Sequence, residues 1–313
     1  MSDVKRIVAV AVGPRRDSLL NARAALNGVR RYVDGLVEGL AKCGRELGVD
    51  YEIDYRERAQ ADLGIGGTQS VFAPTGHGAY DVIFAMSTNV VRAAKNTGTA
   101  TPIVGVVSDR KAEGFSRDRN ITGISARRSQ TAGACFEHFL ATVPTLKKVH
   151  VLHRPGYGPS DRSLALVKKA AKKRGVSVRQ LVVRTRDDIA KKLKALPARR
   201  LDAPAEAGVL VLPVDVCLGS AQLIIDIAQS EKHLPAFFPV TDFVQPNANG
   251  ALGGYGVPQH ACGLLMARYV DGIVWGAASP RSLAVEDATA ADFAWVVSSE
   301  AAATLNVRLP EVV

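Results

Sequence analysis

Four runs of apolar residues along the chain end in the same kind of polar chemistry. Each run is short and continuous, as expected of a strand buried on both faces of a parallel sheet. A hydroxyl, a carboxylate or both follow each run. The runs and the polar residues after them are 84–86 with Ser87 and Thr88, 104–107 with Ser108 and Asp109, 209–212 with Asp215, and 237–240 with Thr241 and Asp242. Because ligands bind outside the carboxyl ends of strands in open α/β sheets, the pattern predicts a small-molecule cleft between two similar lobes.

The rest of the first half alternates between strand-like and helix-like patterns. A helical stripe of apolar residues extends over about 22–47, and a short helix is expected over 89–96. The expected strands are 4–12, 51–56, 81–86 and 102–107. Alternation of this kind predicts an α/β fold with a doubly wound parallel sheet.

A second cycle of the same kind begins near Ser129. The expected helices are 129–143, 163–174, 186–196 and 221–231. The expected strands are 148–153, 177–183, 208–212 and 235–240. The chain therefore contains two doubly wound units of similar length. They repeat in architecture only, since no residue-level repeat relates them.

Three short segments are expected to cross between the two units, near 120–125, 251–256 and 283–285. The helix expected over 259–275 has no place in the second unit, so the simplest topology returns it to the first. The predicted lobes are 1–123 plus 254–283, and 124–253 plus 284–313. Three crossings form a hinge, and hinge closure around a ligand is a familiar use of two such lobes.

Composition agrees with two globular units and excludes a membrane span. The chain has 313 residues, 47% of them hydrophobic and 22% charged, which is ordinary globular composition. No apolar run approaches the ~20 residues that a transmembrane helix needs. The first residues lead directly into a strand and show no secretory leader. We therefore expect either a cytoplasmic protein or a chain whose leader has been removed.

The net charge of +10 is concentrated in one part of the chain. Residues 147–200 hold 17 Lys and Arg against three Asp and Glu, a net of +14, whereas the rest holds 23 against 27, a net of −4. Binding to nucleic acid or to an anionic membrane would use such a region. Solvated helix faces are the favoured interpretation, because no nucleic-acid motif accompanies the charge and four lysines recur at helical spacing: Lys168, Lys169, Lys172 and Lys173.

Motifs for catalysis, metals and cofactors are absent from the sequence. There is no GxSxG, GxxxxGK[ST] or HExxH pattern, and the glycines at 64–67 do not lie between a clear strand and a helix. The six histidines show no metal spacing, and the four cysteines form no CxxC pair. We therefore expect no metal, no cofactor and no enzymatic activity.

Several segments together resemble a known family. In order and spacing they are similar to solute-binding proteins of ABC transporters, in the subgroup that includes uptake proteins for aromatic and other amino acids. The resemblance covers residues 33–310. The segments that carry it are 32–36 with 51–56, 103–109 with 120–125, the Pro-Gly loop at 153–160, 234–237 with 241–244 and 250–256, and the ending at 305–310.

The resemblance implies two doubly wound lobes joined by a three-strand hinge, the periplasmic-binding-protein type I fold. It also implies a periplasmic or membrane-associated location, a small-molecule ligand and an ABC permease as partners, with no nucleic acid, and we expect a monomer. The sequence departs from the family in a longer, more basic first loop (13–27), a Gly-rich segment (62–78) and the missing leader.

In the first lobe, the candidate ligand contacts are hydroxyls and one carboxylate at strand ends. Ser87 and Thr88 lie where a strand meets a helix start, so either they cap the helix or the helix start holds an anion such as a carboxylate. The resemblance favours ligand contact for Thr88, whose position is similar to that of the family's carboxylate-binding hydroxyl. Ser108 and Asp109 end the neighbouring strand, and Asp109 is expected either to cap the next turn or to contact ligand.

In the second lobe, Asp215 and Asp242 are the expected partners of a ligand ammonium. A carboxylate is costly to bury without a partner, although one of the two is also expected to cap a following helix. Tyr157 and Tyr255 are aromatics in Gly-rich loops, where they would either stack on a ligand or, for Tyr255, pack in the hinge. Ser160 would donate to a ligand or begin a helix.

Three functions follow from these expectations. The first is the solute-binding component of an ABC importer that captures a small polar ligand, an amino acid or a related carboxylate, by hinge closure. The second is a cytoplasmic ligand-sensing module of the same fold, without DNA contact because the chain begins in a strand. The third, less favoured, is a racemase-like enzyme, which would need an acid/base pair across the cleft.

Overall fold

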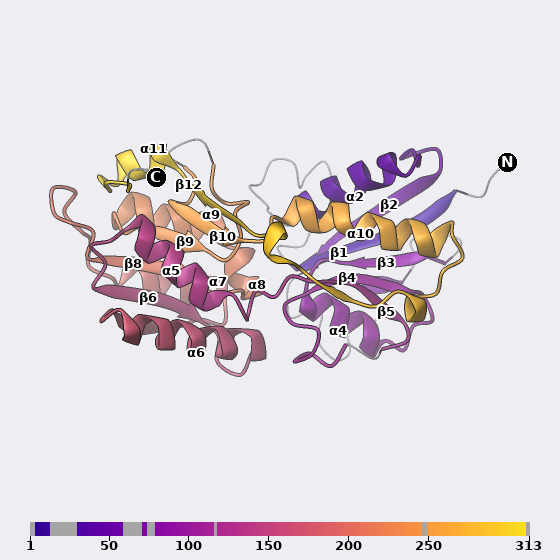
Figure 1. The fold of residues 1–313 in the computed structure, drawn as a ribbon, viewed down its shortest axis with the longest axis horizontal. Helices are drawn as coiled ribbons and strands as arrows, with labels where there is room; N and C mark the ends of the chain where they lie inside the picture. The colour runs from indigo at the N-terminus through magenta and orange to yellow at the C-terminus, as the bar shows by residue number, and fades with distance from the viewer. Residues whose placement is uncertain are drawn as a thin grey trace. The chain divides into compact units, whose positions relative to one another are not determined.

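The computed structural model describes residues 4–12, 30–58, 71–73, 79–115, 118–245 and 249–310. The chain divides into two compact units (Figure 1). Unit 1 comprises Met1–Arg127 with Gln259–Thr289, and unit 2 comprises Arg128–Pro258 with Ala290–Val313. The sequence placed the corresponding boundaries at 123, 253 and 283. The unusual loop at 13–27 and nearly all of the Gly-rich segment at 62–78 lie outside the described residues.

Unit 1 is built on a six-stranded parallel sheet in the order β11-β5-β4-β3-β1-β2. The long apolar β1 lies inside the sheet because both of its faces are buried, and it pairs with β2 from Lys5↔Tyr51 to Val12↔Arg58. The strands of this sheet are β1 (Lys5–Val12), β2 (Tyr51–Arg58), β3 (Val82–Ala85), β4 (Ile103–Val107), β5 (Ile121–Ser125) and β11 (Glu286–Asp287).

Helices cover both faces of this sheet (Figure 1). The helix α4 (Thr88–Asn96) packs against β3, β4 and β1. On the other face, α10 (Gln259–Val274) lies over β3, β4 and β5 and packs along α2 (Arg30–Lys42). The expected return of the late helix to the first unit is therefore what the structure shows, although α2 is described only from Arg30.

Glycines let α2 and α10 approach closely. A Cβ at Gly263 would overlap the carbonyl oxygen of Tyr32, and a Cβ at Gly35 would overlap the carbonyl oxygen of His260. The two backbones touch where no side chain intervenes. This contact ties the end of unit 1's sequence to its beginning.

Unit 2 repeats the plan with the sheet order β12-β10-β9-β8-β6-β7, in which β12 alone is antiparallel. Its strands are β6 (Lys148–His153), β7 (Ser177–Val182), β8 (Ala207–Val211), β9 (Ala236–Phe238), β10 (Gly253–Gly256) and β12 (Ala294–Val297). The alternation of the sequence did not reveal β12, because none of its four residues is buried and no alternation of buried and exposed positions marks it; it follows a short 3-10 turn, η4 (Ala290–Asp292).

The helices of unit 2 differ from the expected ones mainly at their ends. α6 begins at Gly158 rather than Ser163, since Pro159 suits the first turn of a helix. The helix expected over 221–231 continues as a π-helical turn after its first five residues. The helices are α5 (Ala132–Thr142), α6 (Gly158–Lys173), α7 (Arg186–Lys194), α8 (Asp215–Leu218), α9 (Ala221–Ile225), η2 (Asp226–Glu231) and α11 (Ser299–Thr304).

Each unit has its own apolar core. In unit 2 the core is centred on the Phe139 and Phe237 rings, which stack with centroids 5.1 Å apart. In unit 1, α4 and the strand interiors form a second cluster. The third crossing follows η3 (Pro280–Ser282) and β11, because β11 pairs with β5 inside unit 1, whereas the sequence placed this crossing near 283–285. Among the described residues, no helix is long and apolar enough to cross a bilayer.

Candidate functional site

Two strand ends of unit 1 are joined by the hydroxyl of Thr88. β3 and β4 pair so that Ala85 lies opposite Gly105, which brings Thr88 level with Ser108. The Thr88 Oγ1 accepts a hydrogen bond from the Ser108 backbone N–H at 2.9 Å, and both side chains are buried. Ser87 caps α4, because its Oγ accepts from the Val90 N–H at 3.3 Å. The structure thus gives Ser87 the capping role and leaves Thr88 beside it at the helix start.

Asp109 caps the turn that follows it, which was one of the two roles expected for it, the other being ligand contact. Its Oδ1 accepts from the Lys111 and Ala112 backbone N–H groups at 3.2 and 3.1 Å. The side chain is 7% exposed. The next residue, Arg110, binds Asp287 of β11 at 3.2 Å. The loop after β4 is therefore held at both of these positions.

In unit 2, Tyr157 and Ser160 belong to a closed turn that leads into α6. The Ser160 Oγ accepts from the Arg154 N–H at 3.1 Å and is fully buried. Tyr157 is the N-cap residue of α6, only 7% exposed, and the Arg154 guanidinium lies 5.8 Å from its ring centroid. Gly156 permits the turn with a φ of +75°. Tyr157 is thus less exposed than the loop position that the sequence suggested.

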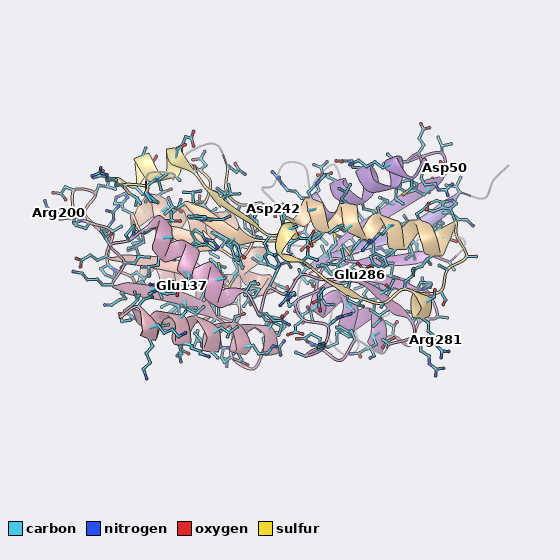
Figure 2. The ribbon with its side chains drawn as sticks, viewed as in Figure 1. Asp50, Glu137, Arg200, Asp242, Arg281 and Glu286 are labelled. Carbon is cyan, nitrogen blue, oxygen red and sulfur yellow. The ribbon has the colours of Figure 1, made fainter. Side chains whose placement is uncertain are left out.

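The two aspartates of unit 2 lie at the carboxyl ends of neighbouring strands. Asp215 is the first residue of α8, after β8, and is half-buried. Asp242 follows β9 and is 7% exposed (Figure 2). Since β8 and β9 are paired, the two carboxylates belong to the same end of the same sheet. This is the arrangement that the apolar runs predicted within the second lobe.

Tyr255 lies in strand β10 and not in a loop. It is paired with Trp295 of β12, and its ring is 4.2 Å from the His138 ring and 5.6 Å from the Phe293 ring. Burial also lowers the pKa of His138. The segment 251–256 was expected as an extended crossing between the units, and its last four residues form β10. The ring is half-buried among these neighbours.

Sequence reasoning did not anticipate a His–Asp pair at the end of β6. The His153 Nε2 and the Asp161 Oδ1 are 2.8 Å apart, and the Asp161 Oδ2 accepts from the Gly156 N–H at 3.1 Å. His153 is 5% exposed, and in the described part of the chain its Nδ1 has no hydrogen-bond partner. The sequence did hold a signal for a polar group at this strand end, because His153 ends an apolar run just before the Pro-Gly loop.

A second unanticipated group is Glu57, which is fully buried one residue before the end of β2. Its neighbour Arg58 donates to the Glu57 backbone carbonyl at 3.0 Å. The expected strand ended at Arg56, so Glu57 lay outside it, whereas β2 continues to Arg58. Within the described ranges, no three His, Cys, Asp or Glu side chains are gathered as a metal site would require.

The cysteines offer no reactive thiolate in the described core. Cys135, Cys217 and Cys262 are buried, while Cys43 is exposed. Burial raises the pKa of the Cys135 thiol to about 12, and burial together with Asp215 raises that of Cys217. Because the thiolate is the nucleophile, buried thiols of this kind are poor acid/base or nucleophilic groups at neutral pH.

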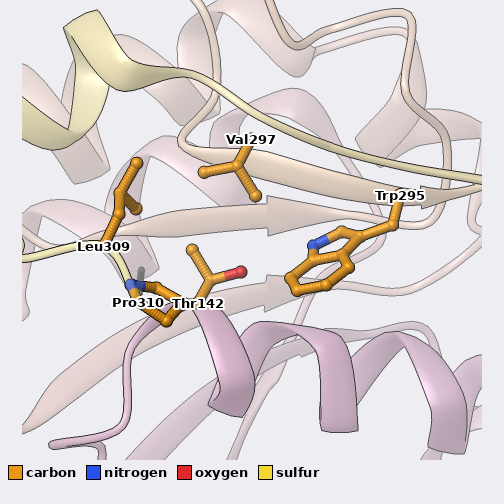
Figure 3. A pocket seen from close by; sticks show the side chains of 5 residues that line it. All are labelled: Thr142, Trp295, Val297, Leu309 and Pro310. Carbon is orange, nitrogen blue, oxygen red and sulfur yellow. The ribbon is translucent and has the colours of Figure 1, made fainter. Parts of the chain in front are cut away.

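A separate apolar pocket of about 270 Å³ lies in unit 2 (Figure 3). It is lined by Thr142, Trp295, Val297, Leu309 and Pro310. Thr142 ends α5, and α5 leads into the amino end of β6, so this pocket does not include the strand ends that carry Asp215 and Asp242.

Solved structures share this two-unit α/β architecture over nearly the whole chain. A conserved domain protein from Vibrio cholerae has a TM-score of 0.74 at 22% identity, covering 99% of this chain and 97% of that one. An ABC domain in complex with L-Trp from Streptococcus pneumonia has a TM-score of 0.75 at 16% identity, with the same coverage. A LacI-family sugar-binding transcriptional regulator from Enterococcus faecalis has a TM-score of 0.56 at 16% identity, covering 93% and 95%. The fold is that of type I periplasmic-binding proteins.

Residues 25–313 match the family described as ABC transporter substrate binding protein. The chain belongs to this family, and the resemblance seen in the sequence is confirmed. A sequence comparison with curated proteins found no match.

Proposed function

We propose that the chain is the solute-binding component of an ABC importer and that it captures an amino acid or a small carboxylate. Family membership supports a small-molecule ligand and a transporter permease as partners. The observation that carries the ligand class is the polar chemistry at the carboxyl ends of both sheets: hydroxyls around Thr88 in unit 1 and carboxylates at Asp215 and Asp242 in unit 2.

Unit 1 would bind the ligand carboxylate. The Thr88 hydroxyl accepts from Ser108, and a hydroxyl that accepts still has a proton to donate. Thr88 also begins α4, where backbone N–H groups and the helix dipole favour an anion. Ser87, Ser108 and Asp109 hold this helix start and the neighbouring strand end in place.

Unit 2 would bind the ligand ammonium and side chain. Asp242 and Asp215 supply negative charge at one sheet end, and a buried carboxylate gains from a cationic partner. Tyr157, Ser160 and Tyr255 would complete the contacts, the tyrosines by stacking and Ser160 by positioning the turn. Ligand contacts from both units would draw the hinge closed.

The first experiment is a thermal-unfolding screen with L-tryptophan, the other amino acids and small carboxylates, followed by calorimetric titration of any compound that raises the melting temperature. A ligand at about 100 times its Kd should stabilise the protein by about 2.7 kcal/mol, which thermal unfolding detects readily. If none of these compounds shifts the melting temperature, the proposed ligand class is wrong.

The ammonium contact has a matched test. Asp242→Asn should weaken binding of L-tryptophan at least about tenfold, because a charged hydrogen bond is lost. Indole-3-propionate, which lacks the ammonium, should bind both proteins equally. Asp202→Asn is the control, since Asp202 is exposed in the same unit and pairs with Arg200. Equal weakening for both ligands would place Asp242 outside the ammonium site.

A cytoplasmic ligand sensor of the same fold is the second candidate. The similarity to a LacI-family regulator favours it, although regulators and transport proteins share the fold. The two functions differ in their partner and location. Release of the native protein from intact cells by osmotic shock, together with stimulation of an ABC importer's ATP hydrolysis by the ligand-loaded protein, supports transport. Retention in the cytoplasm without stimulation supports the sensor.

We infer that the ligand is bound without chemical change. The raised thiol pKa values of Cys135 and Cys217 disfavour a cysteine-based racemase. Chiral chromatography of each bound amino acid, recovered after long incubation, should return the enantiomer that was added. Appearance of the other enantiomer would instead establish racemase activity.

A further inference from the structure

We propose that unit 2 carries a basic face that binds anionic phospholipid headgroups. The basic face consists of exposed side chains on α6, on β7 and at the start of α7. Its members are Lys168, Lys169, Lys172, Lys173, Arg179, Arg184 and Arg186. No part of the proposed ligand-binding function requires these residues.

Amphipathicity places the lysines of α6 outward. The helix buries Ser163, Leu164 and Val167 against unit 2, and its neighbour α5 lies along the side that carries Leu166. The lysines at 168, 169, 172 and 173 occupy the remaining, exposed side of the helix. In Figure 1, α6 lies at the lower margin of unit 2.

The adjoining strand extends the same surface. β7 is an edge strand of its sheet, and five of its six residues are not buried, including Arg179. The chain then continues through the exposed Arg184 and Arg186 into α7. Because parallel crossovers are right-handed, α6 and α7 lie on opposite faces of the sheet, and β7 forms the edge between them. The basic face therefore wraps around one edge of unit 2.

Acidic side chains form no close ion pair with the basic face. In the described part of the chain, none of its seven members has an acidic side chain within 4.0 Å. Asp188 accepts from the Arg184 and Thr185 backbone N–H groups in the capping box of α7. The ion pairs nearby involve other basic residues: Arg174 with Glu137, Lys147 with Glu206 and Arg200 with Asp202.

The chemistry of the face favours lipid headgroups over nucleic acid. No aromatic residue occurs between Tyr157 and Phe237, so the face has no ring on which an unpaired base could stack. Four of its seven members are lysines on α6, which act as mobile point charges, whereas specific phosphate and base recognition favours the planar fork of arginine. Lysines on long apolar stems suit a diffuse plane of phosphates, where each contributes independently.

The test is co-sedimentation with lipid vesicles. Vesicles of phosphatidylcholine with about 30% phosphatidylglycerol should bind the protein, and pure phosphatidylcholine should not. Raising the salt from about 0.05 M to about 0.5 M should abolish binding, because the Debye length shrinks to a few ångströms. Absence of binding to the anionic vesicles at low salt would overturn the proposal.

Matched variants locate the surface. The double substitution Lys168→Gln and Lys172→Gln removes two positive charges from the basic face. It should therefore weaken vesicle binding by about tenfold or more. Arg281→Gln with Arg308→Gln removes the same net charge from exposed positions elsewhere and should have little effect (Arg281 is labelled in Figure 2). Equal weakening by both pairs would reduce the effect to net charge and overturn the assigned face.

The variants should keep the fold and the ligand binding of the unchanged protein. Circular dichroism and ligand titration should be unchanged in the variants, which separates lipid binding from folding and from the proposed ligand site. Duplex and single-stranded DNA are offered in competition with the anionic vesicles. If DNA displaces the vesicles at an equal phosphate concentration and the Lys168/Lys172 variant loses DNA binding as well, the face is a nucleic-acid surface and the lipid proposal is wrong.

Discussion

Polar side chains at the strand ends of both units are engaged by backbone amides. Thr88 accepts from the next strand, Asp109 accepts from its own turn, and Ser160 closes the loop that begins at Arg154. Each of these three groups is buried. Such bonds fix the rotamers of groups that we propose as ligand contacts, so less conformational entropy remains to be lost on binding.

Replacing Thr88 tests this role directly. Thr88→Val keeps the shape but leaves the buried Ser108 N–H without its acceptor, which should lower the free energy of unfolding by about 1–3 kcal/mol. Thr88→Ser retains the hydroxyl and should cost less. Urea denaturation of both variants measures the difference, and a valine variant as stable as the serine variant would contradict it.

His150 predicts a pH dependence. Its side chain is 3% exposed, and burial, with Arg179 and Lys148 nearby, lowers its pKa from 6.5 to about 4. Between these values the unfolded chain binds a proton that the folded chain does not, so stability is lost as the pH falls from 6.5 to about 4. Above pH 6.5 the imidazole is neutral in both states and contributes nothing.

The measurement is urea denaturation across that pH range, compared with His150→Gln, which cannot take up the proton. The wild type should lose up to about 1.4 kcal/mol per pH unit relative to the variant. Parallel stability curves for the two proteins would show that His150 does not titrate as described.

At single residues, sequence reasoning succeeded where the chemistry is local. Ser87 and Asp109 cap the turns that follow them, and both interpretations were foreseen because capping depends on the next three residues. The bond from Ser108 to Thr88 was not foreseen, since it depends on strand register between segments 20 residues apart. The surroundings of Tyr255 depend on β12, a strand that the sequence pattern did not indicate.

Among the elements, α2 and α10 make a contact that leaves no room for added volume. Both helices use a glycine where the other backbone passes, at Gly35 and Gly263. An approach this close is limited by backbone atoms, which cannot rotate away as a side chain can. Because α10 lies over β3, β4 and β5, this contact also positions the helix that covers one face of the sheet of unit 1.

Alanine substitutions along α10 should separate this effect from helix propensity. Gly263→Ala should destabilise the protein by about 1–3 kcal/mol or more, because its Cβ would overlap the Tyr32 carbonyl oxygen. Gly272→Ala, whose Cβ would have only ordinary contacts at 3.9 Å, should be neutral or stabilise by up to about 1 kcal/mol. Thermal unfolding of both variants measures the difference in stability. Equal effects of the two substitutions would disprove the close contact.

Elements were predictable where periodicity is strong and uninterrupted. The strand at 148–153 has the expected bounds, and β7 differs by one residue at its end. Apolar pattern alone did not locate the start of α6, because Gly158 and Pro159 interrupt the pattern yet are compatible with a first turn. It also could not show the π-helical turn η2, in which Gln229 bonds to Ala236, Gly250 and Leu252.

At the scale of the molecule, neither unit is continuous in sequence. In chain order, α10 and β11 of unit 1 follow residues 128–258 of unit 2, and β12 and α11 of unit 2 come last. The sequence revealed this order because a helix remained after the second doubly wound unit was complete. The exact residues at which the chain passes between units depend on short pairings such as β11 with β5, which carry little pattern.

Dividing the chain tests this interdependence. A chain ending at Pro258 lacks α10 and β12, so both units should lose resistance to proteolysis. Co-expression of residues 1–258 with residues 259–313 should restore resistance, because the missing helix and strands are supplied separately. A truncated chain that is as resistant as the whole would show that α10 is dispensable.

The late position of α10 also affects how the protein folds while it is being synthesised. When residue 127 leaves the ribosome, the face of the sheet that α10 will cover is still bare, and it stays so while residues 128–258 are translated. At cellular translation rates this delay is on the order of ten seconds. Nascent unit 1 therefore exposes apolar surface for long enough to be a chaperone substrate.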